Sequence, residues 1–163
     1  MGLDMYFWAE RVCEPSFTKE KDEFTDQLKD SFAGKILGKF PPQSVTYEIG
    51  YWRKANAIHS WFVEKCQGGV DECQRAYVPW GSLMELKASC KEVLADRSKA
   101  DELLPTQSGF FFGDTSYDVN YFDDILHTVK VIEELEASLK DADQITEHGT
   151  PNMNWVFYYQ SSW

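Results

Sequence analysis

The stretch Gly50-Tyr-Trp-Arg-Lys-Ala-Asn-Ala-Ile-His-Ser-Trp-Phe62 decides how the rest of the chain is interpreted. Its apolar side chains recur at spacings of four, three and four residues, which is the period of one face of an α-helix. These side chains are Tyr51, Ala55, Ile58 and Phe62. The spacing predicts a helix that begins at Gly50 and buries one apolar stripe against a core.

A second row on the same predicted helix combines polar and apolar side chains. The row consists of Trp52, Asn56, His59 and Val63. Arg53 and Lys54 would project from the first turn of this helix. Asparagine and histidine are unusual on a face that is at least half-buried, which makes this row a candidate binding site.

The composition predicts one folded unit over residues 1–163. The chain is 43% hydrophobic and 15% aromatic, which is enough to bury a single core. No apolar run approaches the roughly 20 residues that a membrane-spanning helix needs. The N-terminal residues lack a basic flank followed by an apolar run, so we expect no signal peptide and a cytoplasmic protein.

The four cysteines predict neither a disulfide framework nor a metal centre. Cys13, Cys66, Cys73 and Cys90 show no CxxC spacing, and a cytoplasmic chain keeps such thiols reduced. A site made of Cys66, Cys73 and His59 is conceivable, but its spacings match no usual zinc pattern. We therefore expect no metal and no cofactor.

The negative charge of the chain is concentrated in one segment. The formal net charge is −11, and residues 101–143 carry eleven acidic but only two basic side chains. Such a surface should repel nucleic acid and attract a basic groove on a partner protein. The simpler interpretation is a solvated acidic helix that favours solubility.

Alternating and helical patterns along the chain predict an α+β fold. The expected strands lie near residues 3–8, 44–49, 110–112 and 155–160. The expected helices span residues 50–67, 82–96 and 118–139. A small, mostly antiparallel sheet of three or four strands, with the terminal strands paired, would be covered by about three helices. A variable polar arm is expected at about 14–40 and a polar segment at about 141–153.

The stretch Leu103-Leu-Pro-Thr-Gln-Ser-Gly-Phe-Phe-Phe-Gly113 is the second candidate for function. Phe110 to Phe112, between two glycines, predict a short buried strand that is fed by a loop. Thr106, Gln107 and Ser108 would supply hydroxyls, an amide and backbone donors at the end of that strand. Such a loop either holds a ligand or simply turns a corner.

Four stretches together resemble a family of small proteins found in phages and prophages. They are Met1-Gly-Leu-Asp-Met-Tyr6, Gly50 to Phe62, Leu103 to Gly113 and Phe157-Tyr-Tyr-Gln-Ser-Ser-Trp163. The resemblance implies a phage-encoded accessory protein in the bacterial cytosol. Accessory phage proteins of this size are often inhibitors or modifiers of host machinery, and anti-CRISPR proteins are among them.

The first functional hypothesis is an acidic inhibitor of a host defence complex. Such a protein would offer carboxylates to a basic groove on its partner, for example on a Cas9-type nuclease that normally holds a phosphate backbone. The expected contact residues are Asp123, Asp124, Glu133, Glu134 and Glu136. Under this hypothesis the protein binds no nucleic acid directly and no membrane.

The second hypothesis is a protein that binds a small anionic ligand, for example a sponge for a nucleotide signal. Arg53 and Lys54 would pair with phosphates, and Tyr51 or Trp52 would stack on a base. The expected ligand-binding residues are Tyr51, Trp52, Arg53, Lys54, Asn56, His59, Thr106, Gln107 and Ser108.

The third hypothesis is a hydrolase or a metal-independent nuclease. His59 would act as the general base, and Arg53 or Lys54 would stabilise the developing charge. A single histidine within a helical motif is more often a core residue with satisfied hydrogen bonds. We therefore expect an enzyme less than a binding protein.

Overall fold

The two ends of the chain build the centre of the sheet. The computed structural model describes residues 2–13, 23–40 and 42–163. Its strands are β1 (Asp4–Val12), β2 (Ser44–Arg53), β3 (Ala76–Tyr77) and β4 (Trp155–Ser162). They form one antiparallel sheet in the order β2-β1-β4-β3. Strands β1 and β4 pair from Asp4 opposite Ser162 to Arg11 opposite Trp155, which confirms the predicted pairing of the terminal strands.

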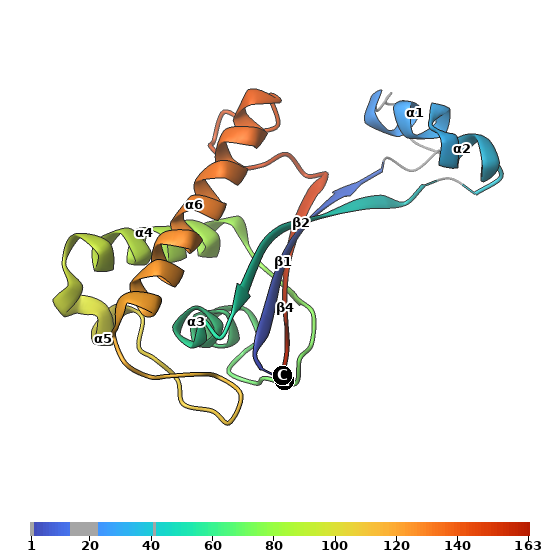
Figure 1. Ribbon diagram of the computed structural model, residues 1–163. Coiled ribbons are helices and arrows are strands. Elements are labelled where there is room, and N and C mark those ends of the chain that lie inside the picture. The colour runs from blue at the N-terminus through green and yellow to red at the C-terminus, as the bar shows by residue number, and fades with distance from the viewer. Residues whose placement is uncertain (1, 14–22, 41) are drawn as a thin grey trace.

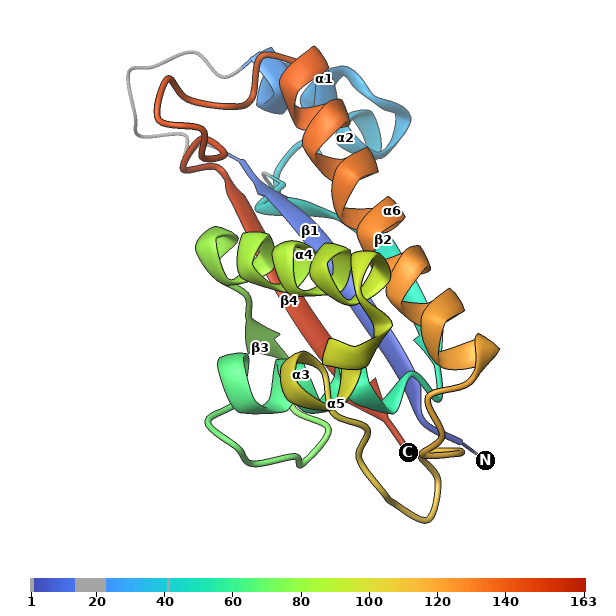
Figure 2. The same cartoon turned by 90° about the vertical axis from the view of Figure 1, so that its left-hand side faces the viewer.

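Helices cover one face of this sheet. The helices are α1 (Glu23–Asp30), α2 (Phe32–Ile36), α3 (Asn56–Cys66), α4 (Trp80–Ala95), α5 (Ala100–Leu103) and α6 (Val119–Asp141), with a 3₁₀ turn η1 (Arg97–Lys99). The longer helices α3, α4 and α6 all lie on the same side of the strands, whereas α1 and α2 lie beyond the far end of β1 and β2 (Figures 1 and 2). The α+β fold is therefore confirmed.

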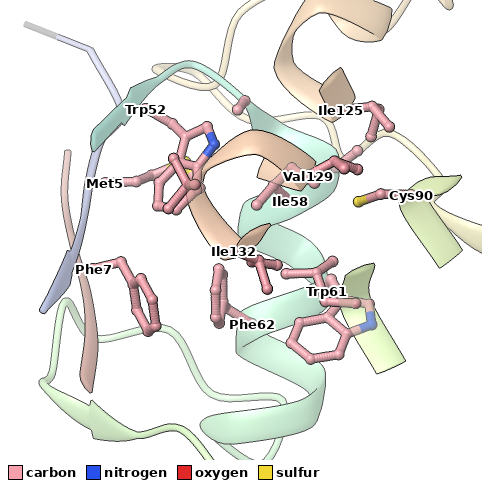
Figure 3. Packing of buried hydrophobic residues seen from close by; sticks show 14 of the residues in the cluster. Met5, Phe7, Trp52, Ile58, Trp61, Phe62, Cys90, Ile125, Val129 and Ile132 are labelled. Carbon is pink, nitrogen blue, oxygen red and sulfur yellow. The ribbon is translucent and has the colours of Figure 1, made fainter. Parts of the chain in front are cut away.

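Alternation along β1 fixes which face of the sheet is buried. Met5, Phe7 and Ala9 are fully buried, while the residues between them stay partly exposed. The buried row meets side chains from α3 and α6 in the main core, as Figure 3 shows for Phe7 and Phe62. Phe62 in turn stacks on Tyr159 of β4, with ring centroids 4.1 Å apart. Apolar burial on this face is what fixes α3 against the sheet.

The long helix α6 agrees with its predicted stripe. The apolar positions predicted from the four-three spacing are all buried: Tyr121, Ile125, Thr128, Ile132, Leu135 and Leu139. Asp118 caps the helix, because its Oδ1 accepts a hydrogen bond from the Tyr121 backbone N–H at 3.1 Å. The helix expected at 82–96 is also present as α4.

The predicted start of the central helix at Gly50 is wrong. Strand β2 continues through Gly50 to Arg53, and α3 begins only at Asn56. The register of β1 with β2 shifts between Phe7 and Trp8, which is the signature of a β-bulge. The bulge places Ile49 as an extra residue on β2, so the residues after it no longer continue the earlier alternation of apolar and polar side chains. A prediction from uninterrupted alternation therefore ends the strand near Ile49.

The predicted strand at Phe110 to Phe112 is also wrong. These residues form a turn, in which the Phe112 N–H donates to the Gly109 carbonyl at 3.1 Å. Only Phe112 is buried, and Phe110 is 94% exposed. Gly113 follows the turn with a φ of +88°, a backbone conformation that glycine adopts at low cost.

The two polar segments carry some regular structure. The arm expected at 14–40 contains α1 and α2, and its residues 14–22 lie outside the described part of the chain. In the segment expected at 141–153, Ile145 and Pro151 form an isolated β-bridge. Across the described residues, none of the helices combines the length and the apolarity that crossing a membrane requires.

Replacement of Gly50 by alanine should destabilise the protein, because α6 packs directly on this position. A Cβ atom at Gly50 would lie 2.8 Å from Cη2 of Trp52 and 2.9 Å from Cγ1 of Val131. We expect Gly50→Ala to lower the free energy of unfolding by about 1–3 kcal/mol in urea titrations. The matched control is Gly81→Ala in α4, where nothing lies within 4 Å of the added Cβ. An equal loss in both variants would contradict this packing.

Candidate ligand-binding cleft

Asn56 joins the two stretches that the sequence singled out. Its side chain is only 5% exposed at the start of α3. Its Nδ2 donates hydrogen bonds to the carbonyls of Phe112 at 3.1 Å and Asp114 at 2.8 Å. Its Oδ1 accepts one from the backbone N–H of Gln107 at 3.0 Å. One buried amide therefore holds the loop of residues 104–118 against the β2–α3 junction.

The β2–α3 junction is a tight and strained turn. Lys54 adopts a φ of +63°, which is costly for a residue with a side chain. Its backbone N–H donates to the Leu3 carbonyl at 2.8 Å, and its own carbonyl accepts from the Asn56 N–H at 2.8 Å. Gly113 passes so close that an added Cβ would lie 3.2 Å from Cβ of Lys54. These contacts compensate the strain and fix the direction of the Lys54 side chain.

A cleft opens where this junction, the loop and the start of α6 meet. Its volume is about 390 Å³, within the size range of small-molecule sites. It is lined by Arg53, Lys54, Ala55, Asn56, Ala57, Ile58, Thr106, Gly113, Asp114, Ser116, Asp118, Asn120, Tyr121, Asp123, Asp124 and Ile125. Segments that are far apart in sequence thus contribute to one concave surface of mixed polar and apolar character.

Two of the acidic side chains in the cleft have structural roles. Asp114 accepts hydrogen bonds from the N–H and the hydroxyl of Ser116, at 2.9 and 2.7 Å, and these bonds lower the pKa of its carboxyl group. Asp118 caps α6 and also accepts a hydrogen bond from Nδ2 of Asn120 at 3.0 Å. These carboxylates hold the loop and the helix start in place.

Asp124 differs from these two because its carboxylate has no hydrogen-bond donor among the described residues. It is half-buried, and burial raises its pKa to about 6, with smaller contributions from the negative charges of Asp123 and Asp118. A carboxyl group with a raised pKa in a cleft is typical of a functional site. An ionised Asp124 would be stabilised by a cation or by N–H donors from outside the chain.

Comparisons with protein-family models, with curated proteins and with solved structures found no match. The candidate site therefore depends on geometry alone. Within the part of the chain that the structure describes, no three histidine, cysteine, aspartate or glutamate side chains are grouped to hold a metal ion.

The structure brings together only part of the predicted ligand-binding set. Arg53, Lys54, Asn56 and Thr106 line the cleft, but Gln107 and Ser108 are not among its lining residues. Asn56 was expected to contact a ligand, yet both its amide nitrogen and its oxygen bond the loop. It positions the site instead. The side-chain Oε1 of Gln107 is buried without a hydrogen-bond partner among the described residues.

The two aromatic residues predicted to stack on a base lie elsewhere. Trp52 points into the core, is 3% exposed and donates its Nε1–H to Oγ1 of Thr128 at 3.0 Å. Tyr51 lies on the opposite, open face of the sheet, where its hydroxyl donates to Asp4. Neither ring is among the residues that line the cleft, because strand alternation replaces the predicted helical spacing here.

His59 lies in a buried network and not in the cleft. It is fully buried, its Nδ1 lies 2.7 Å from the Tyr159 hydroxyl, and its Nε2 lies 2.9 Å from Oδ2 of Asp71. Burial lowers the pKa of His59, and the nearby Asp71 opposes this effect only in part. A neutral ring protonated on Nε2 satisfies both contacts, with the Tyr159 hydroxyl donating to Nδ1. This geometry gives no support to His59 as a general base.

Asp71 extends this network to the C-terminus. Its carboxylate also accepts hydrogen bonds from Nε1 of Trp163 at 2.8 Å and from the Ser161 hydroxyl at 3.2 Å. The Asp71 carboxylate therefore ties the loop after α3 to the end of β4. Nothing in the local sequence pattern around Asp71 indicated this role, since the loop has no regular period.

The predicted acidic surface on α6 is divided into separate parts. Glu133 and Glu136 form ion pairs with Lys91 and Lys87 of α4. Asp123 and Asp124 belong to the cleft at the start of α6, whereas Glu134 is exposed farther along the helix. The five carboxylates thus do not form one continuous face, and two of them are partly neutralised within the chain.

The sequence missed several residues of the cleft. Asp114 and Ser116 come from a segment with no regular period, whereas Asn120 lies in the first turn of the predicted helix; only the structure places them in the cleft. Asp118 had a usable signal, because an aspartate directly before a helical stripe is a typical N-cap.

The buried network predicts different effects for two neighbouring tyrosines. Tyr159→Phe removes the donor to Nδ1 of His59 and should lower the free energy of unfolding by about 1–2 kcal/mol. Tyr158→Phe is the matched control on the open face, and it should change the stability by less than about 0.5 kcal/mol. Urea titration measures both values. Equal stabilities of the two variants would show that the Tyr159–His59 contact contributes nothing.

Proposed function

We propose that this protein binds and sequesters a small anionic molecule that also carries N–H donors, such as a nucleotide. The observation that carries the proposal is the cleft itself. Asn56 ties the loop to the β2–α3 junction, so that Arg53 and Lys54 line one concave surface with the unpaired carboxylate of Asp124.

The charges of the cleft define the class of ligand. Arg53 and Lys54 are exposed and offer charge-assisted hydrogen bonds to phosphate oxygens. Asp124 accepts hydrogen bonds when ionised, and the N–H groups on the edge of a nucleobase are suitable donors. Four aspartates against two basic residues make the cleft unfavourable for a purely anionic ligand. A ligand that carries both a phosphate group and N–H donors fits this distribution of charge in the cleft.

The phage resemblance suggests a biological setting for such binding. A phage-encoded protein that sequesters a nucleotide signal would act against a host defence that depends on this signal. Inhibition of a Cas9-type complex through the carboxylates of α6 stays a prediction. The ion pairs of Glu133 and Glu136 with α4 reduce the acidic surface that this second mechanism needs.

Calorimetric titration with mononucleotides and cyclic dinucleotides tests the proposal. We expect one of these ligands to bind, and Arg53→Ala to weaken the binding by about tenfold through loss of the phosphate contact. Asp124→Asn should also weaken binding, because the amide replaces one acceptor oxygen by a donor. Glu134→Gln, on the same helix but outside the cleft, is the matched control and should bind as the wild type does.

The stability of Asp124→Asn distinguishes a lost ligand contact from a damaged fold. The folded-state pKa of Asp124 is raised above its unfolded value, so its ionisation opposes folding. The penalty is absent at a pH below the unfolded pKa of about 3.9 and complete above the folded pKa of about 6. Asp124→Asn should therefore be more stable than the wild type at neutral pH and equally stable in acid. Equal losses of binding in Asp124→Asn and Glu134→Gln, or no binding by any nucleotide, would contradict the proposal.

A further inference from the structure

One face of the sheet carries exposed aromatic rings and no helix among the described residues. Helices α3, α4 and α6 all lie on the other side of the strands (Figures 1 and 2). On β1, the partly exposed positions that alternate with the buried row are Asp4, Tyr6, Trp8 and Glu10. Their partners across the sheet continue the open face onto β2, β4 and β3.

The strand register groups aromatic rings at the centre of this face. Tyr6 lies opposite Tyr51 of β2, and Trp8 lies opposite Tyr158 of β4, which in turn pairs with Tyr77 of β3. Tyr6 and Trp8 are parallel to within 3°, with ring centroids 5.6 Å apart. Tyr51 and Tyr77 are 41% and 56% exposed. Several rings thus present their surfaces to solvent in one continuous patch.

An arginine of the chain itself already occupies part of this patch. The guanidinium of Arg75 lies 3.9 Å from the centre of the Tyr158 ring and 5.6 Å from that of Trp8. Its NH2 atom also lies 2.9 Å from Oε2 of Glu10. A cation is therefore held by aromatic rings on one side and by a carboxylate on the other. This combination is a favourable setting for a guanidinium group.

The same combination recurs on the neighbouring part of the face. Tyr6 lies between Trp8 and Tyr51, with its ring centroid 5.6 Å from that of Trp8 and 5.5 Å from that of Tyr51. Glu48 is the cross-strand partner of Trp8 on β2. Among the described residues, the Glu48 carboxylate has no ion pair, and no lysine or arginine stacks on Tyr6 or Tyr51. Arg53, two residues after Tyr51 on β2, lies beside them and pairs with Asp4, with 3.9 Å between Nε and Oδ1. A guanidinium from another molecule would find rings and an acceptor in the arrangement that Arg75 uses.

We propose that this open face docks a basic protein partner, whose arginine side chains stack on Tyr6, Trp8 and Tyr51 and pair with Glu48. The net charge of −11 favours the approach of a basic protein. Exposed rings on a sheet can also stack on the bases of single-stranded nucleic acid. That ligand is disfavoured here, because Glu48 on this face has no ion pair among the described residues and the net charge of −11 opposes the approach of a polyanion.

Fluorescence anisotropy with labelled nona-arginine, nona-lysine and oligothymidine at physiological salt tests this proposal. We expect nona-arginine to bind more tightly than nona-lysine, since guanidinium stacks on aromatic rings better than ammonium does. We expect no binding of oligothymidine. Preferential binding of oligothymidine, or equal affinity for the two peptides, would overturn the proposal.

Variants on the open face separate stacking from general charge attraction. Tyr51→Ala should weaken nona-arginine binding by about three- to tenfold, and Tyr51→Phe should retain most of the affinity because the ring remains. Glu48→Gln should weaken binding, whereas Glu134→Gln, which removes the same charge on the helical side, should not. Circular dichroism melts confirm that each variant is folded. Equal effects of Glu48→Gln and Glu134→Gln would overturn the proposed location.

Discussion

The hydrogen bonds of one buried amide hold the two halves of the candidate site together. Asn56 satisfies both its nitrogen and its oxygen on backbone groups of the 104–118 loop, and it does so from the first residue of α3. Such bonds are individually modest, but a buried backbone group that loses its partner is costly. Two further bonds support the loop, because the Leu3 N–H donates to the Phe111 carbonyl at 3.0 Å and the Tyr121 hydroxyl donates to the Leu104 carbonyl at 2.8 Å. Asn56 is the side chain that ties the loop to the start of α3. The shape of the cleft follows from the same contacts.

The one-sided sheet gives the molecule two different candidate binding surfaces. On the covered side, α3 and α6 pack on the sheet, and the starts of both helices meet the end of β2 at the cleft. On the open side, alternate residues of the same strands expose rings and carboxylates. Tyr51 and Trp52 illustrate the division, because adjacent residues of β2 point to opposite faces. Arg53 links the two surfaces, because it lines the cleft and its Nε lies 3.9 Å from Oδ1 of Asp4 on the open face.

The buried histidine network has a pH dependence of its own. The pKa of folded His59 lies below its ordinary value, so the unfolded chain takes up the proton first as the pH falls. The stability that the neutral ring contributes is complete above a pH of about 6.5 and decreases below it. His59 thus behaves as a structural group that joins α3, β4 and the loop containing Asp71.

Much of the fold was predictable from the sequence, but the site was predictable only in part. The stripe of α6 and the pairing of β1 with β4 follow from spacing alone, because tertiary packing agrees there with the local period. The strand through Gly50 was missed because a β-bulge shifts the phase, which no count of apolar residues detects. Arg53, Lys54 and Thr106 were expected in one site and do line one cleft. These residues lie in one cleft with Asp124 because Asn56 makes contacts that are distant in sequence, which the local pattern does not predict. The position of Asp71 beside His59 had no signal in the sequence.

Amide hydrogen exchange on Asn56→Ala, compared with the wild type, tests most directly whether this residue builds the cleft. We expect faster exchange over residues 104–118, with the amide of Gln107 affected most because it loses its acceptor. Strands β1 and β4 should keep their protection, and the exposed variant Asn120→Ala should leave the Gln107 amide unchanged. Unchanged exchange of the loop in Asn56→Ala would contradict the account, because the cleft would then be held by contacts other than those of Asn56.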